Sequence, residues 1–287
     1  MANTDRKARF RQEQEKTSEE LKNAGTFEDD RIKAIFMPTF ADQEERELRI
    51  VTAKKAFEWY MKNDEGYFEE DVLPYRKIGK HFNVGAKGTP LPCLAFHNKE
   101  ACPACEECEE LKKGDEDNVE QAKEMRLQQK YVWIFQWVDA PKALIDVPLI
   151  WEVGLKQHNQ FLGLMGNTRA PEFDHPFEGA SVFIKRIGKK GDSNTFYETD
   201  YEKEEALMFV NDDGEFDYER AEAFLAKLVD IEEYGNPFLS YEETKAIVYG
   251  ESLIDVLKAR NGAPDKAEDE PEEEKPERSS RSRRGRR

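Results

Sequence analysis

The sequence predicts an α+β protein built around a small β-barrel, with helices inserted into a strand-rich middle and appended after it. Strand patterns gather between residues 131 and 201, whereas helix-forming stretches lie at 106–129 and beyond Asp217. A parallel α/β sheet would instead show strands alternating regularly with helices, and that alternation is not evident. The 287 residues suffice for one large or two modest cores.

The clearest strand is YVWIFQWV at 131–138, because its side chains alternate with a period of two. Aromatic residues fall on one face, and Trp133 and Trp137 are expected in the core. Leu144 to Trp151 predicts a second strand, and a helix is expected from about Lys156 to Met165. Residues 181–187 and 195–201 predict a hairpin with a basic turn at 189–192.

The helical stretches have recognisable ends. Glu106 to Gln129 predicts two helices separated at Gly114-Asp115. Tyr218 to Asp230 and Ser240 to Arg260 predict the appended helices, the second starting with a Ser-x-x-Glu capping pattern. Residues 53–62 fit a strand or a helix equally well.

The predicted organisation has three parts. Residues 1–30 form a basic N-terminal arm, with a charge of +3 over the first eleven. Residues 31–263 form the core, with an inserted cysteine-bearing subdomain at about 72–130 and C-terminal helices at about 217–260. Residues 264–287 lack apolar side chains and predict a disordered tail, first acidic and then arginine-rich.

The net charge of −17 is unevenly distributed. Residues 200–255 carry −13, whereas residues 72–104 carry +4. Because binding follows local potential, the overall sign does not exclude a nucleic-acid partner. Mean hydropathy is −0.86, and no apolar run approaches the ~20 residues of a membrane helix, so we expect a cytoplasmic protein without a membrane partner.

All four cysteines lie within 16 residues, near two of the four histidines. A Cys-x-x-Cys pair, Cys102 and Cys105, lets two thiolates reach one ion from a tight turn. Cys93 and a histidine can complete a zinc site. His81 precedes the cysteines, His97 lies among them, and Cys108 follows.

Other uses of these cysteines compete with zinc. A disulfide framework does not suit four cysteines in a long chain without a visible leader. A thioredoxin-like pair needs a βαβ setting, which the loop-like residues around Cys93 do not provide. An iron–sulfur cluster is the strongest rival, since Cys102, Cys105 and Cys108 have ferredoxin-type spacing with Cys93 as the fourth ligand. The remaining interpretation is that the four cysteines are reduced thiols that bind no metal.

Basic and aromatic residues are interleaved in three segments. This mixture is typical of single-stranded nucleic-acid binding, in which cations contact phosphates and rings stack on bases. Equally, alternating aromatics are often core residues, with lysine and arginine stems packed beside them. The candidate contacts are Tyr75, Arg76, Lys77, Lys80, Phe82, Lys87, Lys130, Tyr131, Phe183, Lys185, Arg186, Lys189, Lys190 and Tyr197.

The order His81, Cys93, Cys102-Pro-Ala-Cys105, a helical insert and an aromatic strand ending near Asp139-Ala-Pro141 resembles the single-stranded-DNA-binding (helix-destabilising) proteins of T4-like bacteriophages. The run His175-Pro-Phe-Glu-Gly-Ala180, which leads into 183–185, adds to the likeness. It covers roughly residues 70–210, and the ligand order with the Cys-Pro-x-Cys element is its most specific part.

The resemblance implies an OB-fold core with an inserted zinc-binding subdomain and a cleft lined by bases and aromatics. It makes His81, Cys93, Cys102 and Cys105 the Zn²⁺ ligands, and leaves His97 and Cys108 outside the site. It also places the cations of 76–87, 130 and 185–190 along the cleft, and implies a non-enzymatic function in phage DNA replication, recombination and repair in the host cytoplasm.

The sequence departs from the family at both ends. The segment Arg6-Lys7-Ala8-Arg9 lacks the adjacent hydroxyl pair of the family's cooperativity motif, which leaves self-association along DNA open. The tail is expected to recruit replication proteins through its acidic part, but it ends with six arginines in ten residues. A zinc-stabilised RNA-binding regulator and a metal- or iron–sulfur-dependent nuclease or hydrolase remain alternatives.

Overall fold

The computed structural model describes residues 35–63, 68, 72–167, 169–189 and 195–260. The predicted arm at 1–30 and tail at 264–287 lie outside these residues. The described strands are β1 (Ile35–Phe36), β2 (Glu45–Ile50), β3 (Tyr75–Val84), β4 (Thr89–Pro92), β5 (Gln128–Trp137), β6 (Pro148–Val153), β7 (Val182–Ile187) and β8 (Phe196–Tyr201). The described helices are α3 (Lys54–Tyr60), α4 (Leu94–His97), α5 (Pro103–Leu111), α6 (Glu116–Met125), α7 (Leu155–Met165), α8 (Tyr218–Leu225), α9 (Tyr241–Val248) and α10 (Leu253–Arg260).

The described residues form a mixed α+β fold with one eight-stranded sheet and eight helices. The strand order is β1-β6-β5-β2-β7-β8, with β3 paired to β5 and β4 paired to β3. The β1–β6 pair is parallel, and the other strand pairs are antiparallel. No pairing among the described residues joins β8 back to β1, so the hydrogen-bonded path is open.

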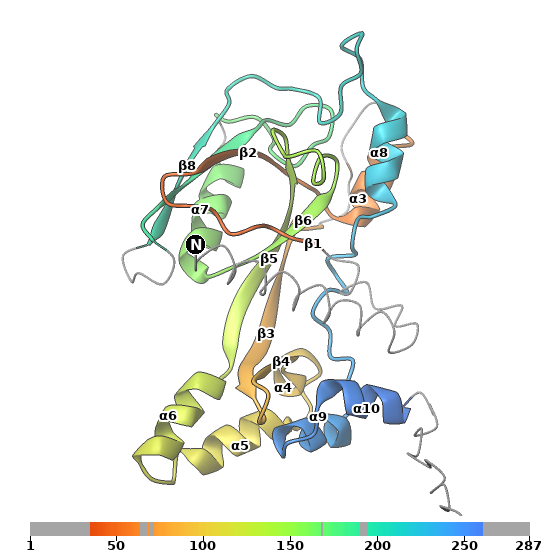
Figure 1. Ribbon diagram of the computed structural model, residues 1–287. Helices are drawn as coiled ribbons and strands as arrows, with labels where there is room; N and C mark the ends of the chain where they lie inside the picture. Colours follow the sequence, from red (N-terminus) through yellow and green to blue (C-terminus); the bar gives the residue numbers. More distant parts are fainter. Residues whose placement is uncertain (1–34, 64–67, 69–71, 168, 190–194, 261–287) are drawn as a thin grey trace, which may run out of the picture.

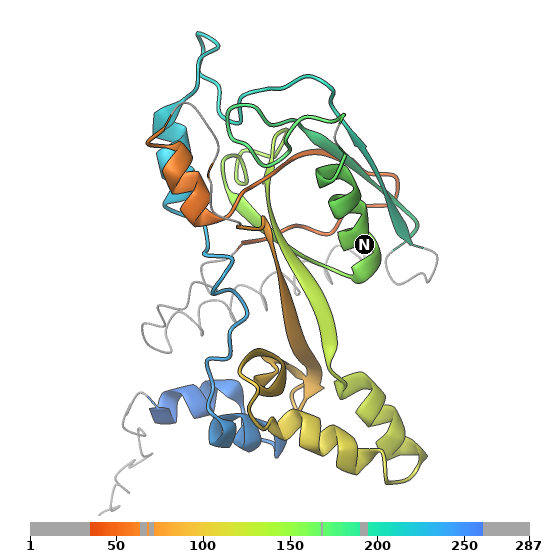
Figure 2. The same cartoon turned by 180° about the vertical axis from the view of Figure 1, so that it is seen from behind.

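β3 and β5 are the longest described strands, at ten residues each, and they connect two parts of the molecule (Figures 1 and 2). At one end lie β2, β6, β7, β8 and α7, with α3 beside α8. At the other end lie β4, α4, α5, α6, α9 and α10, which together with residues 79–84 we call the cysteine unit. The chain after α8 runs beside β3 to bring α9 and α10 to this unit.

Two cores lie on the two faces of the central strands, and the alternation of side chains in β5 divides its residues between them. Trp133 and Phe135 pack in a core with Phe161 of α7, whereas Val132 and Ile134 pack in a second core with Phe57 of α3. Trp133 is fully buried and Trp137 is 9% exposed, which confirms their predicted place in the interior. The observed strand begins earlier than predicted, at Gln128.

The cysteine unit has a core of its own. Leu239 and Ile247 from the C-terminal segment pack with Leu94 and Met125 around the buried cysteines. The helices after residue 238 therefore complete the interior of this unit.

Several other sequence predictions can be compared with these elements. The hairpin is confirmed as β7 and β8, although residues 190–194 of its basic turn lie outside the described part of the chain. The two helices expected between Glu106 and Gln129 are α5, which begins earlier at Pro103, and α6, which ends at Met125. The ambiguous stretch at 53–62 contains helix α3. The single helix expected at 240–260 is instead α9 and α10. Gly250, with φ of 114°, lies between them.

None of the helices in the described part of the chain has the length and apolar character that a bilayer crossing requires.

Candidate metal centre

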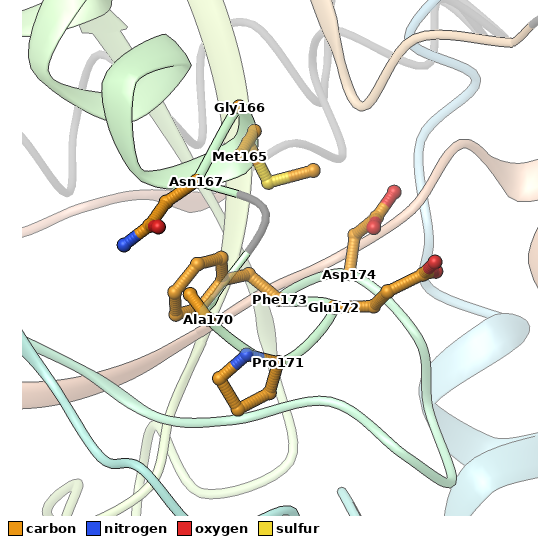
Figure 3. Close-up of a pocket in the computed structure, with 8 residues that line it drawn as sticks. All are labelled: Met165, Gly166, Asn167, Ala170, Pro171, Glu172, Phe173 and Asp174. Carbon is orange, nitrogen blue, oxygen red and sulfur yellow. The ribbon is translucent and has the colours of Figure 1, made fainter.

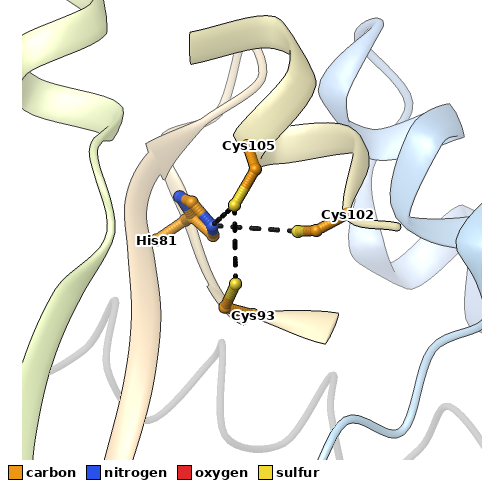
Figure 4. Close-up of side chains that lie close together, drawn as sticks. All are labelled: His81, Cys93, Cys102 and Cys105. Atoms are coloured by element: carbon orange, nitrogen blue, oxygen red, sulfur yellow. Dashed lines mark hydrogen bonds between the residues drawn. The ribbon is translucent and has the colours of Figure 1, made fainter. Parts of the chain in front are cut away.

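Four side chains meet inside the cysteine unit: His81, Cys93, Cys102 and Cys105 (Figure 4). Their ligand atoms all lie within 4.8 Å of one another, so the cluster could hold a metal ion. The Nε2 atom of His81 is 3.3 Å from the Cys105 sulfur and 3.7 Å from the Cys102 sulfur. The sulfurs of Cys93 and Cys105 are 3.6 Å apart. These are the four residues that the resemblance implied as ligands.

Local structure explains how distant residues reach one point. Cys102 and Cys105 come from the start of α5, where Cys102 is the N-cap and Pro103 occupies a position that needs no backbone N–H. Helix N-termini favour negative charge, which suits thiolates at this position. Cys93 follows β4 and is the N-cap of α4. β4 pairs with β3 and thereby brings Cys93 alongside His81.

A hydrogen bond orients the imidazole of His81. Its Nδ1 atom is 2.9 Å from the carbonyl oxygen of Met125, at the end of α6. Since a carbonyl only accepts, Nδ1 carries a proton, and Nε2 is left facing the sulfurs as the ring atom that could bind a metal. A backbone carbonyl on the second ring nitrogen is the usual support for a metal-ligating histidine. His81 is only 1% exposed, which restricts the ring further.

The protonation equilibria of the four groups are coupled. Burial acts to lower the pKa of His81, but hydrogen bonds with the thiol groups outweigh it and raise the pKa to about 12. Hydrogen bonds with Cys105 and Cys93 lower the pKa of Cys102, whereas hydrogen bonds with Cys102 and Cys93 raise the pKa of Cys105. A bound cation would take the place of protons among these donors, so metal affinity falls as pH falls.

The spacing fits one small tetrahedral ion. With metal–sulfur distances of ~2.3 Å, a tetrahedron has edges of about 3.7 Å, close to the separations observed here. A cluster of several irons and sulfides would hold its thiolates farther apart, because the cluster occupies the space between them. One imidazole and three thiolates are also a common ligand set of structural zinc sites.

The two alternative ligands have other partners. The Nε2 atom of His97 is 3.2 Å from both backbone polar atoms of Gly79 in β3. Cys108 is buried one helical turn after Cys105, and its sulfur is 3.8 Å from the carbonyl oxygen of Ala122. Cys108 also contributes to the raised pKa of His81, but its sulfur is not one of the four clustered ligand atoms.

The candidate DNA contacts on β3 and β5 fall on opposite faces of the strand pair. Tyr75 lies opposite Trp133, and Lys77 lies opposite Tyr131, so these four share one face. Lys77 is exposed, and the two tyrosines are half-buried. We call Tyr75, Lys77 and Tyr131 the open face.

On the other face, the candidate cations contact protein groups. Lys80 forms an ion pair with Glu152, which also accepts a hydrogen bond from the Tyr234 hydroxyl. Arg76 donates to the side chain of Asn236. Phe82 and Lys130 lie on the same face, with the Lys130 ammonium 6.0 Å from the Phe82 ring centroid. The segment at 230–236 therefore packs along this face.

The candidates beyond the two central strands have varied surroundings. Arg186 is 4% exposed and donates to the carbonyl oxygen of Phe40. Tyr197 is half-buried and packs edge-on against Phe40 and Trp151. Phe183 and Lys185 are half-buried, Lys87 and Lys189 are exposed, and Lys190 lies outside the described residues.

The sequence patterns missed Phe96, a half-buried aromatic residue of α4. The Lys77 ammonium lies 5.9 Å from its ring centroid and 5.8 Å from that of Tyr131. Phe96 therefore belongs next to the open face. Phe96 lies three residues after Cys93 in a short apolar run, and no pattern in the sequence there indicates that its ring packs beside β3 and β5.

A separate cavity of about 410 Å³ follows helix α7 (Figure 3). Burial raises the pKa of Asp174 in its wall to about 6. Its lining contains no histidine, cysteine, lysine or arginine among the described residues, and it shares no residue with the metal cluster. The lining residues are Met165, Gly166, Asn167, Ala170, Pro171, Glu172, Phe173 and Asp174.

Comparison with known proteins does not assign the chain to a family. No family model matches the sequence, and no curated protein matches it significantly.

Proposed function

We propose that this protein binds single-stranded DNA without regard to base sequence, through an OB-fold-like core and a zinc-stabilised subdomain. The observation that carries the proposal is the exposed Lys77 of the open face. Its ammonium lies 5.8 Å from the ring centroid of Tyr131 and 5.9 Å from that of Phe96, and both rings are half-buried. Cations that track phosphates next to rings that stack on bases are the usual means of gripping an unpaired strand. Lys87, Lys185 and Lys189 are further accessible or half-buried cations.

Zinc is the metal that the ligand set favours, with His81, Cys93, Cys102 and Cys105 as its ligands. Four protein ligands fill a tetrahedral coordination shell and leave no position for a substrate or a reactive water. The metal would therefore stabilise the cysteine unit and would take no part in a reaction. A binding protein is accordingly favoured over a zinc hydrolase or an iron–sulfur nuclease.

The protein would act by mass action. A protein that prefers unpaired strands stabilises them against reannealing by an amount set by its affinity and concentration. With the resemblance to the T4-like phage proteins, this fits a function in phage DNA replication, recombination and repair in the cytoplasm of the host. The acidic C-terminal region would contact replication and recombination proteins, and copies of the chain could also contact one another along a strand.

The test is a titration of fluorescently labelled oligo-dT, followed by polarisation, with duplex DNA and oligo-rU as competitors. A labelled ligand is preferable to intrinsic fluorescence, because Trp133 and Trp137 are buried. We expect binding to unpaired DNA to be tighter than binding to duplex. The logarithm of affinity should fall with the logarithm of salt concentration, with a slope of about −3 if four phosphates are contacted.

Binding to duplex DNA, the dependence on salt and binding to oligo-rU each test a separate part of the proposal. Equal binding to single and double strands, or affinity indifferent to salt, would refute the proposal. Much tighter binding of oligo-rU than of oligo-dT would favour the RNA-binding alternative.

A further inference from the structure

Phe96 packs directly onto the backbone of β3. A Cβ atom at Gly79 would lie 2.5 Å from Cγ and 2.9 Å from Cβ of Phe96, so the ring occupies the space of any larger side chain at residue 79. The ring is half-buried, with part of its surface left accessible. Phe96 thus belongs to the surface of the strand pair although it comes from a separate helix.

Residues on both sides of Phe96 fix its position. The backbone N–H of Cys93 donates to the carbonyl oxygen of Gly79 at 2.9 Å. The backbone N–H of Gly79 lies 3.2 Å from Nε2 of His97, and the two can form a hydrogen bond. Both backbone polar groups of Gly79 are therefore held by α4 and its N-cap. Because Cys93 is also one of the four clustered ligands, the metal centre and the ring share one short segment.

Lys77 and Tyr131 lie on the same face as Phe96. Lys77 is two residues before Gly79 on β3, and it pairs with Tyr131 across to β5. The Tyr131 ring stacks on His158, with centroids 3.7 Å apart and planes 8° from parallel, so His158 covers one face of the tyrosine ring. Lys77 forms no ion pair with any described residue, whereas Lys80 on the other face is paired with Glu152. The Lys77 ammonium group faces the rings of Phe96 and Tyr131, but it is exposed and can also contact a phosphate.

We infer that Phe96, Lys77 and Tyr131 form a subsite for one nucleotide of an unpaired strand. The base stacks on an accessible ring face, and the adjacent phosphate pairs with the Lys77 ammonium. Every base has a π-face, so such a subsite accepts all four bases. The inference rests on the proposed function and adds to it a contact residue carried by the segment that bears a metal ligand.

The experiment compares Phe96→Leu and Lys77→Gln with matched controls, using labelled oligo-dT. Leucine preserves apolar packing on Gly79 but cannot stack on a base. Tyr249→Leu is the aromatic control, since that ring is 70% exposed and lies in the α9–α10 connection. Lys142→Gln is the lysine control, at an exposed position after β5.

We expect Phe96→Leu to weaken oligo-dT binding by about 10-fold without changing the salt dependence, since it removes only stacking. Lys77→Gln should weaken binding and reduce the salt slope by about 0.7, the value for one phosphate on a single strand. The double variant should lose less than the product of the single losses, because both residues grip one nucleotide. Phe96→Trp should restore affinity, and its added emission should be quenched by oligo-dT. Both control variants should bind within twofold of the wild type.

Two results would overturn the subsite while leaving the proposed function intact. One is unchanged oligo-dT affinity in Phe96→Leu, in a protein whose circular dichroism and metal content match the wild type. The other is F96W emission that oligo-dT does not change while the protein is saturated. Failure of the wild type itself to prefer single strands would instead refute the proposed function.

Discussion

Replacing one cysteine inside the cluster should abolish metal binding, whereas replacing its buried neighbour outside the cluster should not. Cys102→Ser removes a thiolate whose sulfur is 3.7 Å from Nε2 of His81. Cys108→Ser is a stringent control because Cys108 lies on the same helix and is equally buried. A serine hydroxyl there can still donate to the Ala122 carbonyl, which is 3.8 Å from the native sulfur.

The stability effect follows from mass action and from the small size of the cysteine unit. Among the described residues its core contains twelve buried residues, three of them cysteines, so we expect a bound metal to add stability to this unit. Free zinc at 100 times its dissociation constant stabilises the folded state by about 2.7 kcal/mol. For a protein of this size, this raises Tm by roughly 5–10 °C.

The assay is thermal unfolding of both variants in zinc buffers, together with metal analysis of the purified proteins. Wild type and Cys108→Ser should contain one metal ion per chain and gain Tm as free zinc increases. Cys102→Ser should contain none and show no response to zinc. The reasoning is refuted if Cys108→Ser loses the metal as readily as Cys102→Ser, or if the wild type contains no stoichiometric metal.

Three further predictions concern stability. Gly79→Ala should cost about 1–3 kcal/mol in urea unfolding, because the new methyl group would meet Phe96 at 2.5 Å. Asp174→Asn should stabilise the protein above pH 6 by at most about 3 kcal/mol, because burial raises the pKa of Asp174 to about 6 and its ionisation opposes folding. This gain should vanish as pH falls below about 4, where the carboxyl is protonated in both states. Ser240→Ala should cost about 1 kcal/mol, since Ser240 and Glu243 form a reciprocal capping box at the start of α9.

Each of these predictions can fail in a defined way. The Gly79→Ala prediction fails if Phe96→Ala in the same chain does not recover part of the lost stability. A pH-independent effect of Asp174→Asn would show that its burial does not oppose ionisation. For Ser240→Ala, hydrogen exchange should accelerate in α9 first, and uniform acceleration across the sheet would contradict the local origin of the effect.

The His81, Cys93, Cys102 and Cys105 cluster could be predicted because its residue types are rare in this sequence and close together in it. Cys102 and Cys105 are brought together by a single helix turn, so their spacing alone indicates that they can bind the same metal ion. Choosing His81 over His97 is different, since both are near the cysteines in sequence. The choice depends on the pairing of β3 with β4, and His97 instead lies against the backbone of Gly79.

The strands could be predicted where one face is apolar and the other differs from it. β5 meets this condition from Tyr131 onward, where aromatic residues alternate with other residues, and Trp133 and Trp137 are buried as predicted. β3 does not, because Arg76 and Lys80 alternate with Ile78 while Lys77 and His81 alternate with Gly79. Its polar side chains are satisfied by distant residues such as Glu152, which no local pattern reveals.

The lack of a clear pattern in β3 also explains why the candidate DNA contacts have such different surroundings. Arg76, Lys77 and Lys80 are close in the sequence, but the alternation of side chains along β3 places Lys77 on the opposite face from the other two. Arg186 lies in a strand with clear alternation, yet it occupies an inward position and bonds to a backbone carbonyl. Arg186 shares its inward row with Val182 and Ile184, and a basic residue in such an apolar row indicates a side chain that is bonded inside the protein.

The sharing of β5 among three neighbours restricts how this architecture can be altered. Along its length β5 pairs with β6 on one edge, and with β3 and then β2 on the other. The cysteine unit therefore cannot be produced as a separate fragment, because β3 and β5 belong to both parts of the molecule. Cutting either strand would also remove strand pairs at the other end of the sheet. The loop between α5 and α6 can change in length without disturbing either ladder, so insertions and affinity tags belong there.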